Sequence, residues 1–150
     1  MRCDELPPLT DPGINLTPGQ SADWSFIQNG EISEETNSKW KTPSAGFRIF
    51  PEESCSTYSI KFNTDCPQNK VTLLLATTGY SFVYFNGKLI HKWGKPYPEK
   101  KYIYLELKKP ELLCGCNSLK VVVYNQNPSP LGLAYNLLQV KDGCYDCDNS

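Results

Sequence analysis

Alternation of apolar and polar residues is the dominant pattern from the segment GFRIF onward. In TYSIKFN, one face of an extended chain carries Tyr58, Ile60 and Phe62, and the other carries Ser59 and Lys61. Further strand-like segments are KVTLLLATT, YSFVYF, KLIHKW, KYIYLEL, SLKVVVYNQ and LGLAYNLLQV. Turns rich in Pro, Gly, Asn and Asp separate them. A series of about seven or eight short strands with almost no helix predicts an all-β protein, folded as a single β-sandwich or jelly roll.

The clearest turn signal is Asn86-Gly87, which lies between YSFVYF and KLIHKW. Both central residues of a two-residue hairpin turn need positive φ, and Asn and Gly tolerate it best. The pair therefore predicts a tight β-hairpin. We expect Tyr84 and Phe85 to pack on opposite faces of its first strand.

The chain divides by composition into three parts. Residues 1–23 are rich in Pro, Gly, Asp and Thr, which predicts an extended arm on the domain surface. Residues 24–143 are expected to form the β-sandwich, and residues 144–150 a cysteine-containing C-terminal tail. The length of 150 residues and a hydrophobic content of 39% suit one globular domain.

Charge and hydropathy argue against several partners. The net charge is −1 and no clustered basic surface is evident, so we expect no nucleic-acid binding. No apolar run approaches the ~20 residues of a membrane-spanning helix, so no membrane insertion is expected. No apolar leader segment follows Met1, which predicts either a cytosolic chain or a piece of a longer secreted one.

Cysteine content favours the second of these alternatives. A secreted, disulfide-bonded domain is the natural interpretation of so dense a set, and an odd number leaves one cysteine unpaired or joined to another chain. The seven cysteines are Cys3, Cys55, Cys66, Cys114, Cys116, Cys144 and Cys147. Asn15-Leu16-Thr17 is a weak glycosylation signal at Asn15, because Pro18 follows it.

The order of motifs resembles the galactose-binding-like jelly rolls. These occur as accessory domains of β-galactosidases, rhamnosidases and related glycoside hydrolases, and in many carbohydrate-binding modules. The motifs that carry the resemblance are Tyr80, Asn86-Gly87, Trp93, the step at residues 116–119, the Val-rich strand ending at Asn125, and the segment 130–133. They span a little over half of the chain. The resemblance implies a jelly-roll fold with sites on variable loops.

The same resemblance implies that the chain ends lie near each other. Cys3 would then reach Cys144 or Cys147, and the remaining one of these two would reach Cys114 or Cys116. Cys55 and Cys66 bracket a strand and form an open alternative pair, since an extended strand would hold them too far apart.

Metal binding is a second interpretation of some of these residues. Cys114, Cys116, Cys144 and Cys147 could instead hold a structural zinc ion, although the Cys-x-Cys spacing is tight for it. Asp65 and Asp11 are candidates for a structural calcium ion at a turn, as in jelly rolls of this type. No other cofactor is expected.

Little in the sequence indicates catalysis. His91 is the single histidine, no G-x-S-x-G elbow is present, and no pattern pairs two carboxylates across a cleft. We therefore expect a protein that is not an enzyme.

Carbohydrate binding is the sharpest functional hypothesis. Sugar sites combine an aromatic side chain that stacks on a pyranose with planar polar groups that bind hydroxyls. The candidate contacts are Trp93, Tyr97 and His91 in the loop HKWGKPYPEKKY, and Asn125 and Asn127 after the Val-rich strand. The alternative for Trp93 is a packing residue at the rim of the sandwich.

Three functions remain open. The first is a non-catalytic recognition module of the extracellular space, cell surface or virion surface that binds glycan or a surface protein. The second is a structural or assembly domain of a larger surface, coat or virion protein, joined to neighbours by its arm or by an intermolecular disulfide. The third is an accessory domain of a glycoside hydrolase.

Overall fold

The computed structural model describes residues 49–64, 70–97, 99–100 and 102–140, together with the backbone of five short strands nearer the N-terminus. The seven main strands are β6 (Ser54–Thr64), β7 (Lys70–Thr77), β8 (Tyr80–Phe85), β9 (Lys88–Gly94), β10 (Ile103–Lys108), β11 (Gly115–Tyr124) and β12 (Leu133–Val140). The short strands are β1 (Asp4–Glu5), β2 (Leu9–Thr10), β3 (Ile14–Leu16), β4 (Ile27–Gln28) and β5 (Glu31–Ile32). Within these residues no helix is long and apolar enough to cross a membrane.

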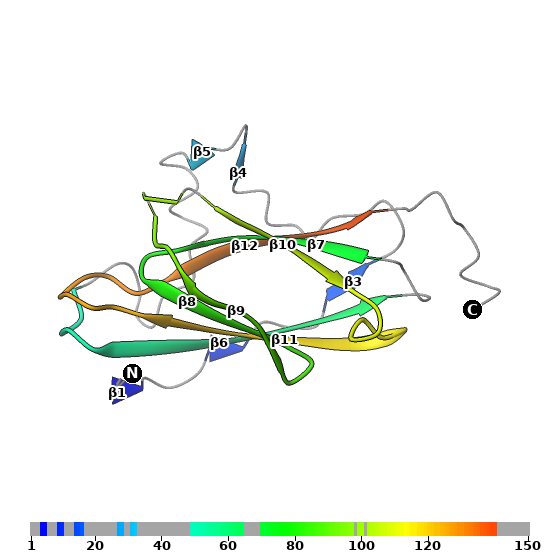
Figure 1. The fold of residues 1–150 in the computed structure, drawn as a ribbon, viewed down its shortest axis with the longest axis horizontal. Coiled ribbons are helices and arrows are strands. Elements are labelled where there is room, and N and C mark those ends of the chain that lie inside the picture. Colours follow the sequence, from blue (N-terminus) through cyan, green and yellow to red (C-terminus); the bar gives the residue numbers. More distant parts are fainter. Residues whose placement is uncertain are drawn as a thin grey trace.

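The main strands form two sheets that face each other (Figure 1). One sheet has the antiparallel order β6-β11-β8-β9 and the other has the antiparallel order β10-β7-β12. Along the chain from β6, successive strands alternate between the sheets, except that β8 and β9 form a hairpin within one sheet. The prediction of an all-β sandwich is confirmed.

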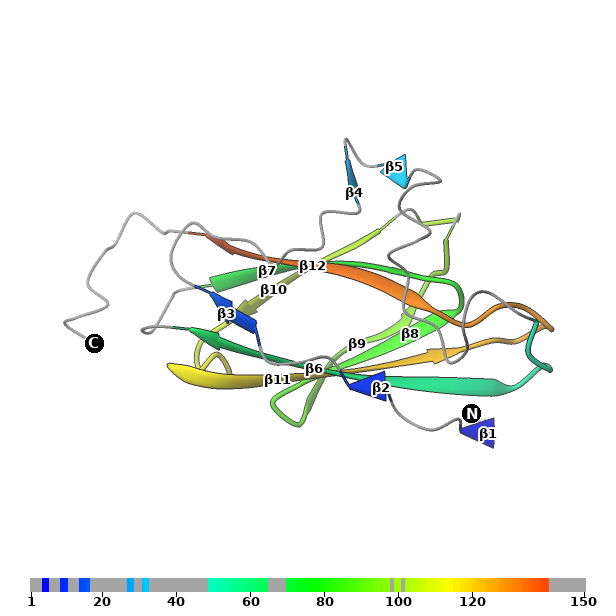
Figure 2. The ribbon, with the colours of Figure 1, turned by 180° about the vertical axis from the view of Figure 1, so that it is seen from behind.

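Parts of the N-terminal segment lie along the edge of the first sheet. β1, β2 and β3 each pair in parallel with β6, and Figure 2 shows β2 and β3 beside this strand from behind. β4 and β5 pair with each other in a separate two-stranded sheet. The predicted limits of the arm and of the C-terminal tail fall outside the described residues and stay predictions.

The alternating pattern fills the space between the sheets. Tyr58, Ile60 and Phe62 are buried on the inner face of β6, as their spacing predicts. Burying a side chain of this size contributes about 1.5–3 kcal/mol. Phe62 stacks with Phe85 at 6.2 Å between ring centroids. The Ser56 hydroxyl donates to the Tyr58 oxygen at 2.9 Å, and burial raises the pKa of Tyr58 to about 12.

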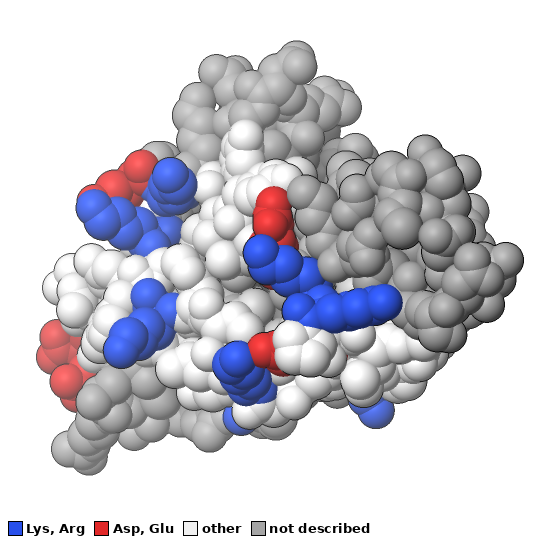
Figure 3. All heavy atoms as spheres, turned by 45° about the vertical axis from the view of Figure 1, so that its right-hand side comes forward, with Lys and Arg blue, Asp and Glu red and all other residues white. Residues whose placement is uncertain are grey.

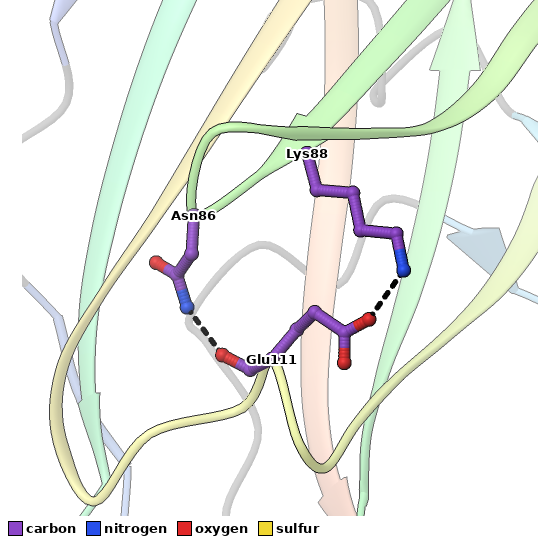
Figure 4. A network of polar contacts seen from close by, with 3 residues as sticks. All are labelled: Asn86, Lys88 and Glu111. Carbon is purple, nitrogen blue, oxygen red and sulfur yellow. Dashed lines mark hydrogen bonds and ion pairs between the residues drawn. The ribbon is translucent and has the colours of Figure 1, made fainter.

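The predicted hairpin turn is present, with φ of 48° at Asn86 and 85° at Gly87. As expected, Phe85 lies in the core and Tyr84 on the opposite face. The turn is tied to the segment before β11, because Asn86 Nδ2 donates to the Glu111 carbonyl oxygen at 2.7 Å and Lys88 Nζ pairs with Glu111 Oε1 at 2.6 Å (Figure 4). The Lys88 contact lowers the pKa of the Glu111 carboxyl.

Candidate functional site

The far end of the β8–β9 hairpin departs from regular pairing. Val83 lies opposite His91, and Ser81 lies opposite Gly94, so a two-residue step on β8 matches a three-residue step on β9. The extra residue is a β-bulge, a feature that often re-aims a side chain. Within it, Trp93 has φ of 56°, in the left-handed region that a bulky residue rarely adopts.

The bulge places the Trp93 indole on the outer face of the sheet, among three aromatic rings. The centroid of Trp93 lies 4.9 Å from that of Phe82, 5.8 Å from Tyr80 and 6.3 Å from Tyr124. All three pairs are edge-to-face, with interplanar angles of 64°, 76° and 80° respectively, which is a favoured arrangement for aromatic rings. Trp93 remains 47% exposed while Phe82 and Tyr124 are buried. We call these four residues the aromatic platform.

A pocket of about 220 Å³ adjoins the platform at one end of the sandwich. Its lining residues are Thr78, Gly79, Tyr80, Pro96, Tyr124, Asn125, Gln126, Asn127 and Ser129. The pocket and the platform share Tyr80 and Tyr124. Gly79 lies directly against the Tyr124 carbonyl oxygen, and a Cβ there would collide with it, so this close approach requires glycine.

Asn125 lines the pocket but its amide is occupied by the protein. It is 1% exposed, and its Oδ1 accepts from the Ser54 amide at 2.7 Å. Its Nδ2 donates to the carbonyl oxygens of Phe50 at 3.3 Å and Ser129 at 3.4 Å. The prediction of Asn125 as a sugar contact is therefore wrong. Buried backbone groups where β11 ends need partners, and this amide supplies them.

The other predicted contacts separate into two groups. Asn127 is exposed on the pocket rim together with Gln126, so two amides do lie beside the platform. Tyr97 instead packs against the main core, and its backbone amide donates to the Thr77 carbonyl oxygen at 2.7 Å. The structure thus places Tyr97 against the core and not in the platform, and its role as a sugar contact stays a prediction.

His91 is also not part of the platform. It lies opposite Val83, whose side chain is in the core, and its Nε2 atom is buried with no hydrogen-bond partner. Gly94 lies between this atom and the Ser81 hydroxyl, which is likewise buried and unpartnered. Burial lowers the pKa of His91. His91 therefore faces inward, beside a second register shift that lies between Val83 and Tyr84, and the structure does not bring it together with the platform. Its role as a ligand contact stays a prediction.

Three of the seven cysteines lie among the described residues, so the expectation of one unpaired cysteine stays a prediction. Cys114 and Cys116 are both exposed thiols at the start of β11, where Cys116 lies opposite Asn63 on the solvent side of the sheet. Cys55 is fully buried. The remaining predicted ligands and partners lie outside the described residues: Cys3, Cys66, Cys144, Cys147, Asp11 and Asp65. Asn15 is described only as backbone, in β3 opposite Asn63.

The pairings and metal sites that involve those residues stay predictions. Among the described residues, no group of three or more His, Cys, Asp or Glu side chains could hold a metal ion.

Three members of the platform were not identified from the sequence. Tyr80 and Phe82 alternate along β8, and Tyr124 ends β11, a pattern that by itself indicates core and cross-strand pairs. The signal that could have found them is the register Tyr124↔Tyr80, which brings the two ends together beside Trp93. The bulge that adds Trp93 to them leaves no mark in the hydrophobic pattern.

No protein-family model matches this sequence, and no curated protein matches it. Among solved structures, the chain is similar to a β-glucosidase from Kluyveromyces marxianus in complex with glucose, with 15% identity over 60% of this chain and 10% of that chain, and a TM-score of 0.42. It is also similar to a GH31 α-xylosidase from Xanthomonas citri, with 13% identity over 56% of this chain and 10% of that chain, and a TM-score of 0.35.

A third similarity is to a family 35 carbohydrate-binding module from an environmental isolate, with 12% identity over 68% of this chain and 83% of that chain, and a TM-score of 0.33. The chain therefore spans a tenth of the length of each hydrolase and most of the length of the binding module.

Proposed function

We propose that this chain is a non-catalytic recognition module that binds glycan on the aromatic platform, in an extracellular or surface setting. The observation that carries the proposal is the state of Trp93, whose indole is half exposed and braced by three rings on a left-handed backbone. Such backbone strain persists where the surroundings enforce it, and it clusters at binding sites. An indole held in this way is suited to stack on the apolar face of a pyranose ring.

The adjoining pocket suits the hydroxyl groups of the same ligand. All of its lining residues are uncharged, and Gln126 and Asn127 are exposed at its rim. Amide groups both donate and accept hydrogen bonds, as sugar hydroxyls do. A sugar stacked on Trp93 can therefore extend its hydroxyls into the pocket past Tyr80 and Tyr124.

Sugar binding with and without the indole tests the proposal. After a broad glycan panel selects a ligand, calorimetric titration compares the parent, Trp93→Ala and Tyr104→Ala. Tyr104 is the matched control, because it is an aromatic residue that is 55% exposed on β10 of the opposite sheet. We expect Trp93→Ala to weaken binding about tenfold or more, which is ~1.4 kcal/mol, and Tyr104→Ala to leave it unchanged.

Two results would overturn the proposal. One is the absence of binding across the whole panel, and the other is equal affinity of the parent and Trp93→Ala. A chain that binds no sugar but forms oligomers that reductant dissociates would instead favour the assembly domain.

A further inference from the structure

A second group of polar side chains lies on the same outer face as the aromatic platform. Ser59 and Lys61 point outward from β6, since Ile60 between them is in the core. Ser118 and Lys120 point outward from β11, since Leu119 between them is likewise buried in the core. The register places Ser59 opposite Lys120 and Lys61 opposite Ser118. These four residues form a two-by-two block, which we call the donor block.

The donor block consists of two ammonium groups and two hydroxyl groups. Both lysines are exposed, and both serines are partly exposed. Directly and diagonally opposed residues on neighbouring strands lie within reach of one another. All four side chains can donate hydrogen bonds, and the two ammonium groups cannot accept them.

The described outward-facing residues of β6, β8 and β11 include no carboxylate that could balance these charges. The outward positions are Cys55, Thr57, Ser59, Lys61 and Asn63 on β6, Tyr80, Phe82 and Tyr84 on β8, and Cys116, Ser118, Lys120, Val122 and Tyr124 on β11. None of them is acidic. The Lys120 ammonium lies 5.3 Å from the centre of the Tyr84 ring, and no ion pair joins Lys61 or Lys120 to another described residue.

Three lysines elsewhere in the described residues lie beside carboxylates. Lys88 lies 2.6 Å from Glu111, Lys95 lies 3.4 Å from Glu99, and Lys108 lies 3.6 Å from Glu106. On the face seen in Figure 3, several basic side chains accordingly lie beside acidic ones. Lys61 and Lys120 differ from these three, because no ion pair joins them to a described carboxylate.

We propose that the donor block binds the anionic oxygen group of an acidic glycan, a carboxylate or a sulfate ester, while a neighbouring sugar stacks on Trp93. This inference rests on the proposed function. Ammonium and hydroxyl donors form charge-assisted hydrogen bonds with anionic oxygens. A neutral sugar gains no such contribution. Lysine is a point charge without a planar fork, so both kinds of anion fit the block.

The spacing of the two sites fits one short oligosaccharide. Along a strand, side chains on one face are about 6.6–6.8 Å apart. On β11, Lys120 lies two such steps from the platform residue Tyr124. On β8, Tyr84 lies directly opposite Lys120, and the platform residues Phe82 and Tyr80 lie one and two steps away from Tyr84. The donor block thus begins about 7–14 Å from the rings that brace Trp93.

Matched pairs of ligands test this inference. An oligogalacturonate is compared with its carboxyl-reduced form, and a sulfated oligosaccharide with its desulfated form, by calorimetry at low and high salt. The proteins are the parent, Lys61→Gln, Lys120→Gln, the double variant and Trp93→Ala. The control is Lys108→Gln, which removes the same charge from β10 on the opposite sheet.

We expect at least one acidic member to bind more tightly than its neutral partner at low salt. Each single lysine variant should weaken acidic binding about two- to fivefold, as for exposed ion pairs. The double variant should bind the acidic and neutral members equally, and Lys108→Gln should match the parent. Salt should weaken only acidic binding. The two acidic arms distinguish carboxylate from sulfate.

The possible failures are distinguishable. If the parent binds acidic and neutral ligands equally and Trp93→Ala weakens both, the donor block inference fails and the proposed function stands. If the acidic preference depends on the lysines and Trp93→Ala has no effect, the block stands as an anion site and the proposed function fails. An acidic preference that persists in the double variant overturns the inference, and so does equally tight binding of polyglutamate.

Discussion

The two ends of the β8–β9 hairpin are built from the same two strands in opposite ways. At the turn end, Asn86 and Gly87 adopt positive φ, as these residue types readily do, and the Asn86 side chain is fully used. At the bulged end, Trp93 adopts the same backbone region with no such tolerance, and the buried polar atoms of Ser81 and His91 lack partners. At the turn end, the backbone preferences and hydrogen bonds of the residues therefore agree with the fold. At the bulged end, they conflict with it.

This difference separates scaffold from site. A sequence that specifies its structure satisfies local preferences almost everywhere, and exceptions concentrate where function requires them. The turn end meets that standard through hydrogen bonds to the segment before β11. The bulged end violates it while exposing an indole beside a pocket. The comparison therefore locates the candidate site from backbone strain and unpartnered polar atoms as well as from the exposed indole.

The largest expected effect concerns the turn end. Asn117 is 1% exposed, and its Oδ1 accepts from the Leu113 amide at 2.8 Å and from Asn86 Nδ2 at 3.1 Å. Its Nδ2 donates to the carbonyl oxygens of Leu113 at 2.9 Å and Gly115 at 3.2 Å. Asn117→Ala leaves these groups without partners. We expect the free energy of unfolding, measured with urea, to fall by about 3 kcal/mol.

The matched control for this change is Asn127→Ala. Asn127 is exposed on the pocket rim, so its loss should change the free energy of unfolding by no more than about 0.5 kcal/mol. If both substitutions lowered the free energy of unfolding by similarly small amounts, the hydrogen bonds at the turn end would not stabilise the fold. The contrast between the two ends of the hairpin would then be wrong.

A smaller effect is expected at Trp93. In an ordinary strand, glycine is about 0.5–1 kcal/mol less stable than alanine because it loses more backbone entropy. At φ of 56° the order should reverse, since an L residue pays roughly 1–2 kcal/mol for the left-handed conformation and glycine does not. We therefore expect Trp93→Gly to be more stable than Trp93→Ala in urea unfolding.

The comparison of the two variants cancels the loss of the indole contacts, which both share. The same pair of substitutions at Tyr104, in the regular strand β10, should give the ordinary order, with alanine more stable than glycine. If alanine is the more stable replacement at both positions, the bulge holds no backbone strain, and its use as a marker of the site is lost.

The sequence predicts the scaffold well and the site only in part, for physical reasons. The β6 alternation and the Asn86-Gly87 turn are local signals, and both are found in the structure. The sequence also singles out Trp93 as a candidate contact in a loop, whereas the structure places it near the end of β9. Its position on the outer face depends on a bulge, which is a mismatch between two strands and is invisible in either strand alone.

Asn125 shows the opposite limitation. An amide that follows a strand is a typical sugar contact. Here, however, both donors of the amide and one acceptor position of its oxygen are bonded to the segment 50–54 and to Ser129. Only the tertiary structure reveals that demand. The donor block is also non-local, since it requires the register between β6 and β11.

The smallest expected effect is a pH dependence that originates behind the platform. Burial lowers the pKa of His91 in the folded protein, so the unfolded chain, with an ordinary value near 6.5, binds the proton more readily. Above about pH 6.5 the imidazole is neutral in both states and stability is unaffected. As the pH falls below that value the unfolded state gains protons first, and the free energy of unfolding should decrease.

The measurement is the urea midpoint at pH 7.5 and pH 5.5 for the parent and His91→Leu. His91 is the single histidine. Glu111, whose pKa is lowered from 4.5, contributes stability that is lost only as the pH falls through a more acidic range. The parent midpoint should therefore drop at pH 5.5, and that of His91→Leu should not. An equal drop in both proteins would place the titrating group elsewhere and remove His91 from the strained end of the hairpin. A drop confined to the parent would show that a neutral imidazole faces the core at the bulged end of the hairpin, next to the strand segment that presents Trp93 outward.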